Sequence, residues 1–241
     1  MPTGQFAACA GWWLYGLRYP VLMCKIHAVL SRSYAGAWSR CWYAGMLLAM
    51  LAVMVVLAGC SSSPPPLKWN LNTSVQGQIP DLAFHLVDGR NQALTAGDFH
   101  GKVVMLYFGY THCPDVCPLT MTDMHVALTK LGPLAKDVRI LFVTVDPARD
   151  TPAVLHKYVK SFDKRAIGLT GSEQQIKALA GRYHESFSRG PSDGQGGYEV
   201  NHSAAIYIFD GKGRARLLAT PADSPASVAH DLRQLIEQEH A

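Results

Sequence analysis

Two cysteines, Cys113 and Cys117, carry the most reactive side chains in the body of this 241-residue chain. Three residues separate them, so a disulfide between them closes too small a loop to stabilise a fold substantially. Thiolates are soft ligands that bind Cu(I), zinc or iron–sulfur clusters in preference to hard ions. The pair is therefore predicted to be reactive or metal-binding. The other four cysteines all lie in the first 60 residues: Cys9, Cys24, Cys41 and Cys60.

A metal ion held by two sulfurs alone stays under-coordinated, so a third donor is expected. His202 is the first candidate because it lies between a polar, glycine-rich loop (residues 189–197) and an apolar strand (residues 204–209). From such a position a side chain can reach over a neighbouring strand end. His112 is the second candidate, because neighbouring residues on a turn usually point apart and Cys113 follows it directly.

The elements around these residues follow from hydrophobic patterns. Near-continuous apolar runs predict buried strands, and apolar residues at helical spacing predict helices that begin at capping residues and prolines. The expected strands are residues 103–108, 139–145, 167–170, 204–209 and 214–219, after a small hairpin that begins with residues 82–87 and turns at residues 88–90. The expected helices are residues 119–132, 152–162, a segment from 172 and a segment from 225. This order predicts an α/β sandwich with a central mixed sheet and an N-terminal hairpin.

Three segments together resemble the Sco/SenC family of copper proteins: residues 110–118 (YTHCPDVCP), residues 145–152 (VDPARDTP), and His202-Ser203 before a strand. The resemblance covers about residues 79 to 237. It implies a thioredoxin-like fold with a histidine-bearing loop insertion, and copper, as Cu(I) or Cu(II), bound by Cys113, Cys117 and His202. It further implies a metallochaperone that supports assembly of the CuA centre of cytochrome c oxidase. The expected partners are the CuA-bearing subunit and other copper or thiol-redox proteins.

Four further residues are candidates for contacts around such a site. Asp115, between the cysteines, either tunes the site or supplies favourable charge at a helix N-terminus. Asp146 ends a strand on the same sheet edge as the cysteines, although Asp-Pro is also an ordinary turn. Asn201 stands where many family members have aspartate, and an amide can only hydrogen-bond to the histidine beside it. His112 is the fourth.

The N-terminal part predicts export and lipid attachment. Residues 46–58 form an apolar run of 13 residues, which is short for a membrane span of ~20 residues but suits a signal peptide. The run leads into Leu57-Ala58-Gly59-Cys60, which resembles a bacterial lipoprotein signal. We therefore expect a leader (residues 1–59), an acylated Cys60 with a flexible tether (residues 60–78) and a copper-binding domain (residues 79–241). A signal anchor that happens to contain a cysteine is the alternative.

Either arrangement places the domain on the extracytoplasmic face of a bacterial membrane, which is the periplasmic side in a Gram-negative cell. Four of the 22 basic residues precede Cys60, which leaves 18 basic against 18 acidic ones, so the charge gives no reason to expect nucleic-acid binding.

The competing functions are a copper metallochaperone and a thiol–disulfide oxidoreductase that uses Cys113 and Cys117 on partner cysteines. A copper- or redox-sensing protein is a third class, so enzymatic activity is uncertain.

Overall fold

The computed structural model describes residues 45–50, 68–71, 73–192, 194 and 197–240. Contacts divide the chain into two units, Met1–Pro65 and Pro66–Ala241. Residues 45–50 of the first unit are helical, and every other described element belongs to the second. Among the residues described, no helix has both the length and the apolar character that crossing a membrane requires. Cys60, the predicted lipid attachment point, lies outside the described residues.

The second unit alternates strands and helices, as the sequence predicts. Its strands are β1 (His85–Asp88), β2 (Ala93–Thr95), β3 (Val103–Gly109), β4 (Val138–Thr144), β5 (Ala166–Thr170), β6 (Ser188–Ser192), β7 (Tyr198–Asn201), β8 (Ile206–Phe209) and β9 (Ala215–Ala219). Its helices are α2 (Val116–Leu131), α3 (Pro152–Phe162), α4 (Glu173–Arg182) and α5 (Pro225–His240), with 3-10 turns η1 (Ala96–Phe99) and η2 (Gly132–Asp137).

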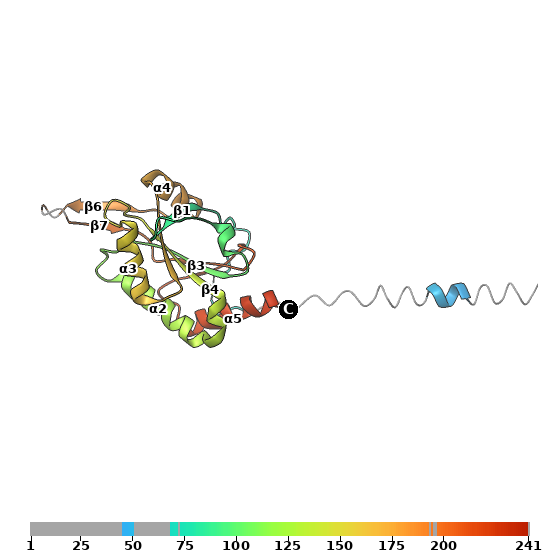
Figure 1. The fold of residues 1–241 in the computed structure, drawn as a ribbon. Helices are drawn as coiled ribbons and strands as arrows, with labels where there is room; N and C mark the ends of the chain where they lie inside the picture. Colours follow the sequence, from blue (N-terminus) through green and yellow to red (C-terminus); the bar gives the residue numbers. More distant parts are fainter. Residues whose placement is uncertain (1–44, 51–67, 72, 193, 195–196, 241) are drawn as a thin grey trace, which may run out of the picture. The chain divides into compact units, whose positions relative to one another are not determined.

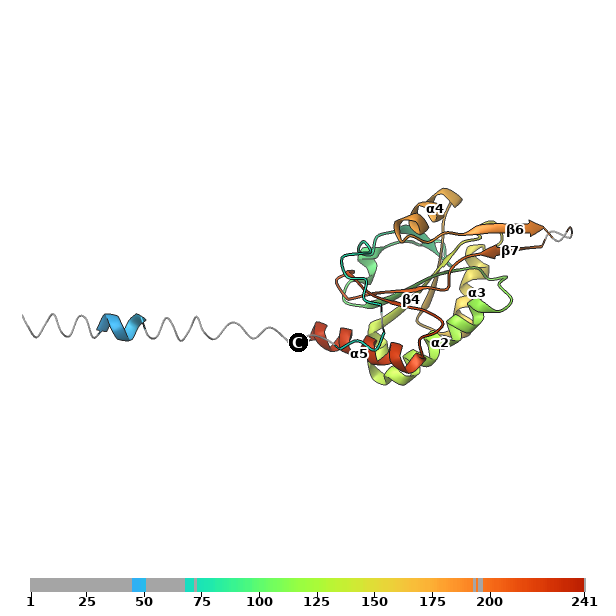
Figure 2. The same cartoon turned by 180° about the vertical axis from the view of Figure 1, so that it is seen from behind.

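The central sheet is mixed, which confirms the predicted architecture. Its seven strands follow the order β2-β1-β5-β4-β3-β8-β9. Strand β4 pairs in parallel with β3 and with β5, whereas the outer pairs are antiparallel. The expected N-terminal hairpin consists of β1 and β2, and it lies at one edge of the sheet. Figures 1 and 2 show α2, α3 and α5 on one side of this sheet and α4 on the other.

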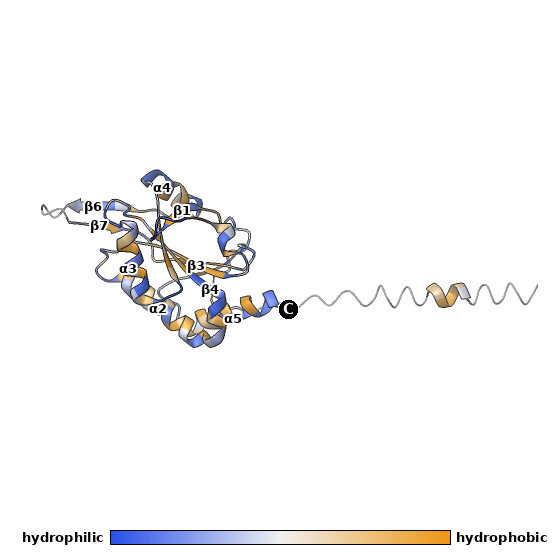
Figure 3. Cartoon of the chain, in the orientation of Figure 1, coloured by the Kyte–Doolittle hydropathy of each residue, from blue (hydrophilic) through white to orange (hydrophobic). Residues whose placement is uncertain are grey.

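Strand β3 is the middle of the sandwich, and all seven of its residues are buried. Successive side chains of a strand point to opposite faces. Tyr107 accordingly packs against Phe142, with ring centroids 5.8 Å apart, and Phe108 packs against Tyr183 on the other face, at 6.4 Å. Figure 3 shows the apolar residues gathered on the central strands and the hydrophilic ones on α4 and β6. Covering on both faces explains why β3 reads as an uninterrupted apolar run.

The helix starts follow the capping patterns in the sequence. The Thr151 hydroxyl accepts a hydrogen bond from the Val154 N–H at 3.4 Å, with proline at the first helical position of α3. Ser172 and Gln175 form the predicted capping box of α4. Helix α2 begins at Val116, earlier than the apolar spacing indicates.

The segment before His202 is a β-hairpin, whereas the sequence predicts a loop. Residues 189–197 read as a loop, but β6 covers the first part of this stretch, up to Ser192, and pairs antiparallel with β7 in a separate two-stranded sheet. The pairing joins Ser188 to Asn201 and Arg189 to Val200. The stretch is polar because both strands lie outside the main sheet, where Figure 1 shows them extending side by side. The predicted histidine-bearing insertion is thus a β-hairpin whose second strand ends beside His202.

Candidate metal centre

The parallel pairing of β3 and β4 brings two connecting loops to one edge of the sheet. Gly109 ends β3 opposite Thr144, which ends β4. The chain after β3 carries Cys113, and the chain after β4 carries Asp146 and Asp150. Strand ends at one edge of a parallel sheet are a frequent location for binding sites.

The two cysteines meet at the start of α2. Cys117, its second residue, is fully buried, whereas Cys113 is half-buried in the turn before the helix. The Cys117 backbone N–H donates a hydrogen bond to the Cys113 sulfur at 3.4 Å. Pro118 follows without loss of a helical hydrogen bond, because the first four N–H groups of a helix have no partner within it. The Cys113 sulfur therefore occupies the end of the helix where negative charge is favoured.

A buried carboxylate, that of Asp150, fixes the loop that carries the cysteines. Its oxygens accept hydrogen bonds from the Thr111 N–H at 3.0 Å and from the Thr111 hydroxyl at 2.6 Å. The Thr144 hydroxyl at the end of β4 donates a third, also at 2.6 Å. Hydrogen bonds to an ionised acceptor are about twice as strong as neutral ones. Asp150 thus connects the loop after β4 to the loop after β3, at Thr111, which lies two residues before Cys113.

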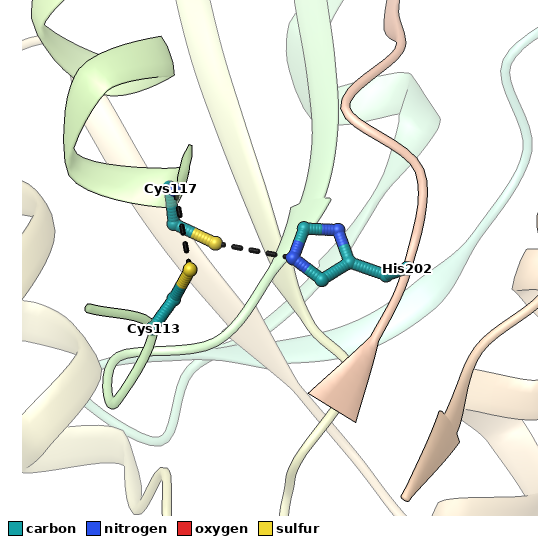
Figure 4. A group of neighbouring side chains, drawn as sticks. All are labelled: Cys113, Cys117 and His202. Atoms are coloured by element: carbon teal, nitrogen blue, oxygen red, sulfur yellow. Dashed lines mark hydrogen bonds between the residues drawn. The ribbon is translucent and has the colours of Figure 1, made fainter. Parts of the chain in front are cut away.

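His202 approaches the cysteine pair from the end of the hairpin, as Figure 4 shows. Its Nε2 atom lies 3.2 Å from the Cys117 sulfur. Its Nδ1 atom lies 2.6 Å from the Ser203 carbonyl oxygen. A carbonyl oxygen only accepts, so Nδ1 carries the proton and donates it, which leaves the lone pair of a neutral ring on Nε2. This is the tautomer in which a histidine binds a metal through Nε2.

Glu185 holds the backbone next to His202. This residue is buried. Its carboxylate accepts hydrogen bonds from the Ser203 N–H at 2.8 Å and from the Ser203 hydroxyl at 2.9 Å. The Tyr207 hydroxyl of β8 donates a third, at 3.1 Å. The residue after the histidine is therefore tied to the main sheet through a charged group.

The hairpin is fastened to the loop after β4 by one aromatic residue. The Tyr198 hydroxyl donates a 2.7 Å hydrogen bond to Asp146. The guanidinium groups of Arg149 and Arg189 lie over the Tyr198 ring, 3.6 and 4.3 Å from its centroid. Arg149 also pairs with Asp146. We call this cluster of Asp146, Arg149, Arg189 and Tyr198 the hairpin latch.

Aromatic rings enclose the imidazole and the sulfurs. Tyr107 and Tyr110 meet the His202 ring edge-on, with centroids 6.1 and 5.8 Å away. Burial raises the pKa of the Cys117 thiol to about 12, although the Tyr107 hydroxyl and a Tyr110 backbone hydrogen bond lower it. At neutral pH this thiol is protonated in the metal-free protein, so metal binding must displace its proton.

The structure brings Cys113, Cys117 and His202 together. One ligand atom from each lies within 4.8 Å of the other two. Two sulfurs and an imidazole nitrogen form a donor set suited to a soft or borderline ion such as Cu(I), Cu(II) or zinc. The same sulfurs can alternatively join each other as a disulfide. The geometry thus permits metal binding and two-electron redox chemistry.

The other predicted residues lie around this group without entering it. The His112 ring turns toward Thr111 and Asp150, 3.1 and 3.6 Å from their nearest oxygens. Asp115 is exposed directly before α2 and makes no side-chain capping bond there. Asn201 is exposed on β7. Asp146 acts on the hairpin through Tyr198.

Three residues that the sequence did not single out position the site: Asp150, Glu185 and Tyr198. Asp150 had a detectable signal, because it lies just after a strand parallel to β3. Glu185 and Tyr198 had no such signal in the sequence. Glu185 is 18 positions from its partner Ser203, and Tyr198 is 52 positions from its partner Asp146.

Comparison with known proteins identifies the family. The model of the SCO1/SenC family matches residues 73–237, which is more than half of the chain. The chain belongs to the SCO1/SenC family. The resemblance read from the three motifs is thereby confirmed, and the matched region contains Cys113, Cys117 and His202.

Relatives of this SCO1/SenC chain include the mitochondrial protein SCO2 homolog of Bos taurus, 42% identical over 140 residues, which are 57% of this chain and 53% of the relative. The chain spans about half the length of the first curated relatives it matches. ScoI of Bradyrhizobium japonicum, solved with copper bound, is 35% identical, covers 65% of this chain and 99% of its own, and has a TM-score of 0.60.

Apo Sco1 of Thermus thermophilus is 32% identical and covers 71% of this chain and 99% of its own, with a TM-score of 0.62. These structures confirm the expected thioredoxin-like α/β fold.

Proposed function

We propose that this protein is a copper metallochaperone that supports assembly of the CuA centre of cytochrome c oxidase. Cys113, Cys117 and His202 hold Cu(I) or Cu(II), and the ion is passed to the CuA-bearing subunit. The convergence of three soft or borderline donor atoms within 4.8 Å carries the proposal. The copper bound to the Bradyrhizobium japonicum relative supports the choice of metal.

Loading of copper requires that the Cys117 thiol lose its proton. Because burial raises the pKa of this thiol to about 12, the metal-free form retains the proton and the site stays uncharged at this sulfur. An arriving cation favours the thiolate and releases the proton. The Cys117 N–H that donates to the Cys113 sulfur favours negative charge there.

Release of copper is favoured by a site with few ligands. Three donors leave a position open to an incoming thiolate, which can displace one donor at a time. His202 is the donor most suited to leave, because it follows the hairpin, whereas the two sulfurs come from the turn before α2 and from the first turn of α2 itself. Its attachments are Glu185 behind Ser203 and the hairpin latch.

Titration of the reduced full chain with Cu(I) against a competing chelator tests the ligand set. Removal of groups that merely orient a ligand costs about 10 to 100-fold in metal affinity. The His202→Ala substitution removes a ligand, so we expect a loss of at least about tenfold.

His112→Ala tests the competing donor, and His85→Ala is the matched control, since His85 is exposed on β1. Both variants should bind copper as the wild type does. Equal affinity for the wild type and His202→Ala would refute the ligand assignment.

A thiol–disulfide oxidoreductase is the second candidate function. The half-buried Cys113 and the buried Cys117 suit the roles of attacking and resolving thiol. The Cys113 thiolate would attack a partner disulfide and form a mixed disulfide, releasing one partner thiolate. Cys117 would then displace the second partner sulfur, so the pair is oxidised and the partner reduced by two electrons. Rapid disulfide reduction in insulin by the copper-free full chain would favour this function.

We also propose that Cys60 carries a lipid that holds residues 79–241 on the extracytoplasmic face of the membrane through a tether at residues 60–78. The apolar run followed by small residues and cysteine supports this proposal. Labelled fatty acid should enter the wild type and a Cys41→Ser control but not a Cys60→Ser variant. Incorporation into Cys60→Ser would contradict it.

A further inference from the structure

A cleft with a volume of about 390 Å³ lies at the end of the sheet opposite the cysteines. Lys102 directly precedes β3 and Arg139 is the second residue of β4, whereas Cys113 follows the other end of β3. A seven-residue strand spans about 20 Å. The cleft is therefore separate from the metal centre, and both can be occupied at once.

Four lysine and arginine side chains line this cleft: Arg90, Lys102, Arg139 and Lys160. Two of them have carboxylate partners. Arg90 pairs with Asp88 at 3.4 Å and Lys102 with Asp137 at 2.8 Å. Such pairs leave little net charge to attract a ligand.

The other two cations are bound only to neutral oxygens. The Arg139 guanidinium donates to the carbonyls of Lys136 and Val138, at 2.9 and 2.7 Å. The Lys160 ammonium donates to the Lys164 carbonyl at 2.6 Å. Within the part of the chain that the structure describes, neither forms an ion pair. Two uncompensated positive charges thus face one cavity.

The acidic groups of the cleft are already engaged in their own turns. Asp88 accepts the backbone N–H groups of Arg90 and Gln92, at 2.8 and 2.9 Å. Asp98 accepts both the N–H and the hydroxyl of Thr95, at 2.7 and 2.9 Å. These bonds leave the charge of each carboxylate in place, but four cations face only these two carboxylates in the lining, so the cleft keeps a net positive charge.

The lowered pKa of Lys160 is consistent with an excess of positive charge in the cleft. Partial burial lowers the pKa of Lys160, and the guanidinium groups of Arg90 and Arg139 lower it further. Asp163 and Asp88 act in the opposite direction without cancelling these effects. A bound anion would relieve this repulsion.

We propose that this cleft binds a phosphate group, presented either by a free phosphate compound or by an anionic lipid headgroup. A guanidinium and an ammonium that share a cavity match the several acceptor oxygens of a phosphate. Leu94, Phe99 and Ile167 add apolar surface to the lining, and a volume of this size also admits an organic part next to the phosphate. The proposal is independent of copper binding.

Calorimetric titration of the full chain in neutral detergent tests the site. One titration uses inorganic pyrophosphate, and a second uses micelles that contain phosphatidylglycerol, with phosphatidylcholine micelles as the uncharged reference. The Arg139→Gln/Lys160→Gln double variant removes the uncompensated cations. Lys130→Gln/Arg233→Gln makes the same change of charge on α2 and α5, at two residues that do not line the cleft.

We expect the wild type to bind at least one probe and the cleft variant to bind it on the order of 100-fold more weakly, because each of the two charge-assisted hydrogen bonds to the phosphate contributes about tenfold. The control variant should stay within about twofold. Binding of pyrophosphate identifies free phosphate compounds as ligands, and binding of phosphatidylglycerol alone identifies the headgroup.

Binding of neither probe, or equal binding by the cleft variant, would overturn the proposal. Thermal unfolding followed by circular dichroism checks that the variants fold. If the double variant does not fold, Lys160→Gln alone carries the test, because the Lys160 ammonium is bonded only to a carbonyl.

Discussion

Replacement of Asp150 by alanine should destabilise the protein and loosen the loop that carries the cysteines. The buried carboxylate accepts three hydrogen bonds, from the Thr111 N–H, the Thr111 hydroxyl and the Thr144 hydroxyl. Alanine leaves all three donors without their acceptor. Each unsatisfied buried donor costs about 1–3 kcal/mol, and the loss of a buried charge that was itself costly to desolvate offsets part of the sum.

The expected net loss is about 3 kcal/mol, with most of it from the backbone N–H, which cannot turn to another acceptor. For a domain of this size such a loss lowers the melting temperature by roughly 6–12 °C. Asp150→Asn should cost less, because one amide oxygen still accepts from Thr111 N–H and Thr144. The freed Thr111 hydroxyl has the His112 nitrogen within 3.1 Å as an alternative partner.

Thermal unfolding of the metal-free full chain measures these differences. Asp115→Ala is the control, since this exposed carboxylate lies in the same loop without a side-chain capping bond. It should shift the melting temperature by no more than about 2 °C. A copper titration of Asp150→Ala adds a second readout, with a loss of about tenfold or more expected from a less ordered Cys113. Equal melting temperatures for Asp150→Ala and Asp115→Ala would refute the anchoring role.

Three further predictions concern the histidine side of the site and its protons. Glu185→Gln should weaken copper binding about tenfold in chelator competition, because Ser203 loses a charged acceptor. Tyr198→Phe should raise the rate of copper transfer to a chelator a few-fold in stopped-flow absorbance, because its bond to Asp146 is lost while the ring remains; an unchanged rate would contradict the latch. Since burial raises the pKa of Cys117 to about 12, loading displaces at least this proton, so copper affinity should rise by at least about tenfold per pH unit between pH 6 and 8 in the same competition assay.

The parts of the fold that the sequence predicts well are those set by local pattern. The apolar run of β3, the cap and proline of α3, and the capping box of α4 each depend on residues within one turn or one strand. Such features can be predicted because the residues that produce them are adjacent in the chain: an unbroken apolar run indicates a strand buried on both faces, and a cap and its partner lie within three residues of each other. The placement of Cys113 and Cys117 after β3 is predictable for the same reason.

The hairpin is harder to predict because its strands are polar and lie outside the core. Periodicity identifies a strand by its buried face, and only Val200 of β6 and β7 is buried. The glycines of this segment indicate a turn, but nothing nearby indicates that the flanking residues pair with each other. The position of His202 between the glycine-rich segment and β8 indicates that it can reach the sulfurs, but not that the segment before it is a paired hairpin.

The supporting carboxylates show why a ligand set is easier to predict than its anchors. Cys113, Cys117 and His202 are rare, chemically distinctive residues, whereas Asp150 and Glu185 are ordinary acids whose role arises from burial next to donors from distant segments. Each acid fixes one side of the site to the main sheet: Asp150 the cysteine loop and Glu185 the residue after the histidine. Because the two sides are anchored separately, a substitution at Asp150 should loosen the cysteine loop without loosening His202, and a substitution at Glu185 should do the reverse.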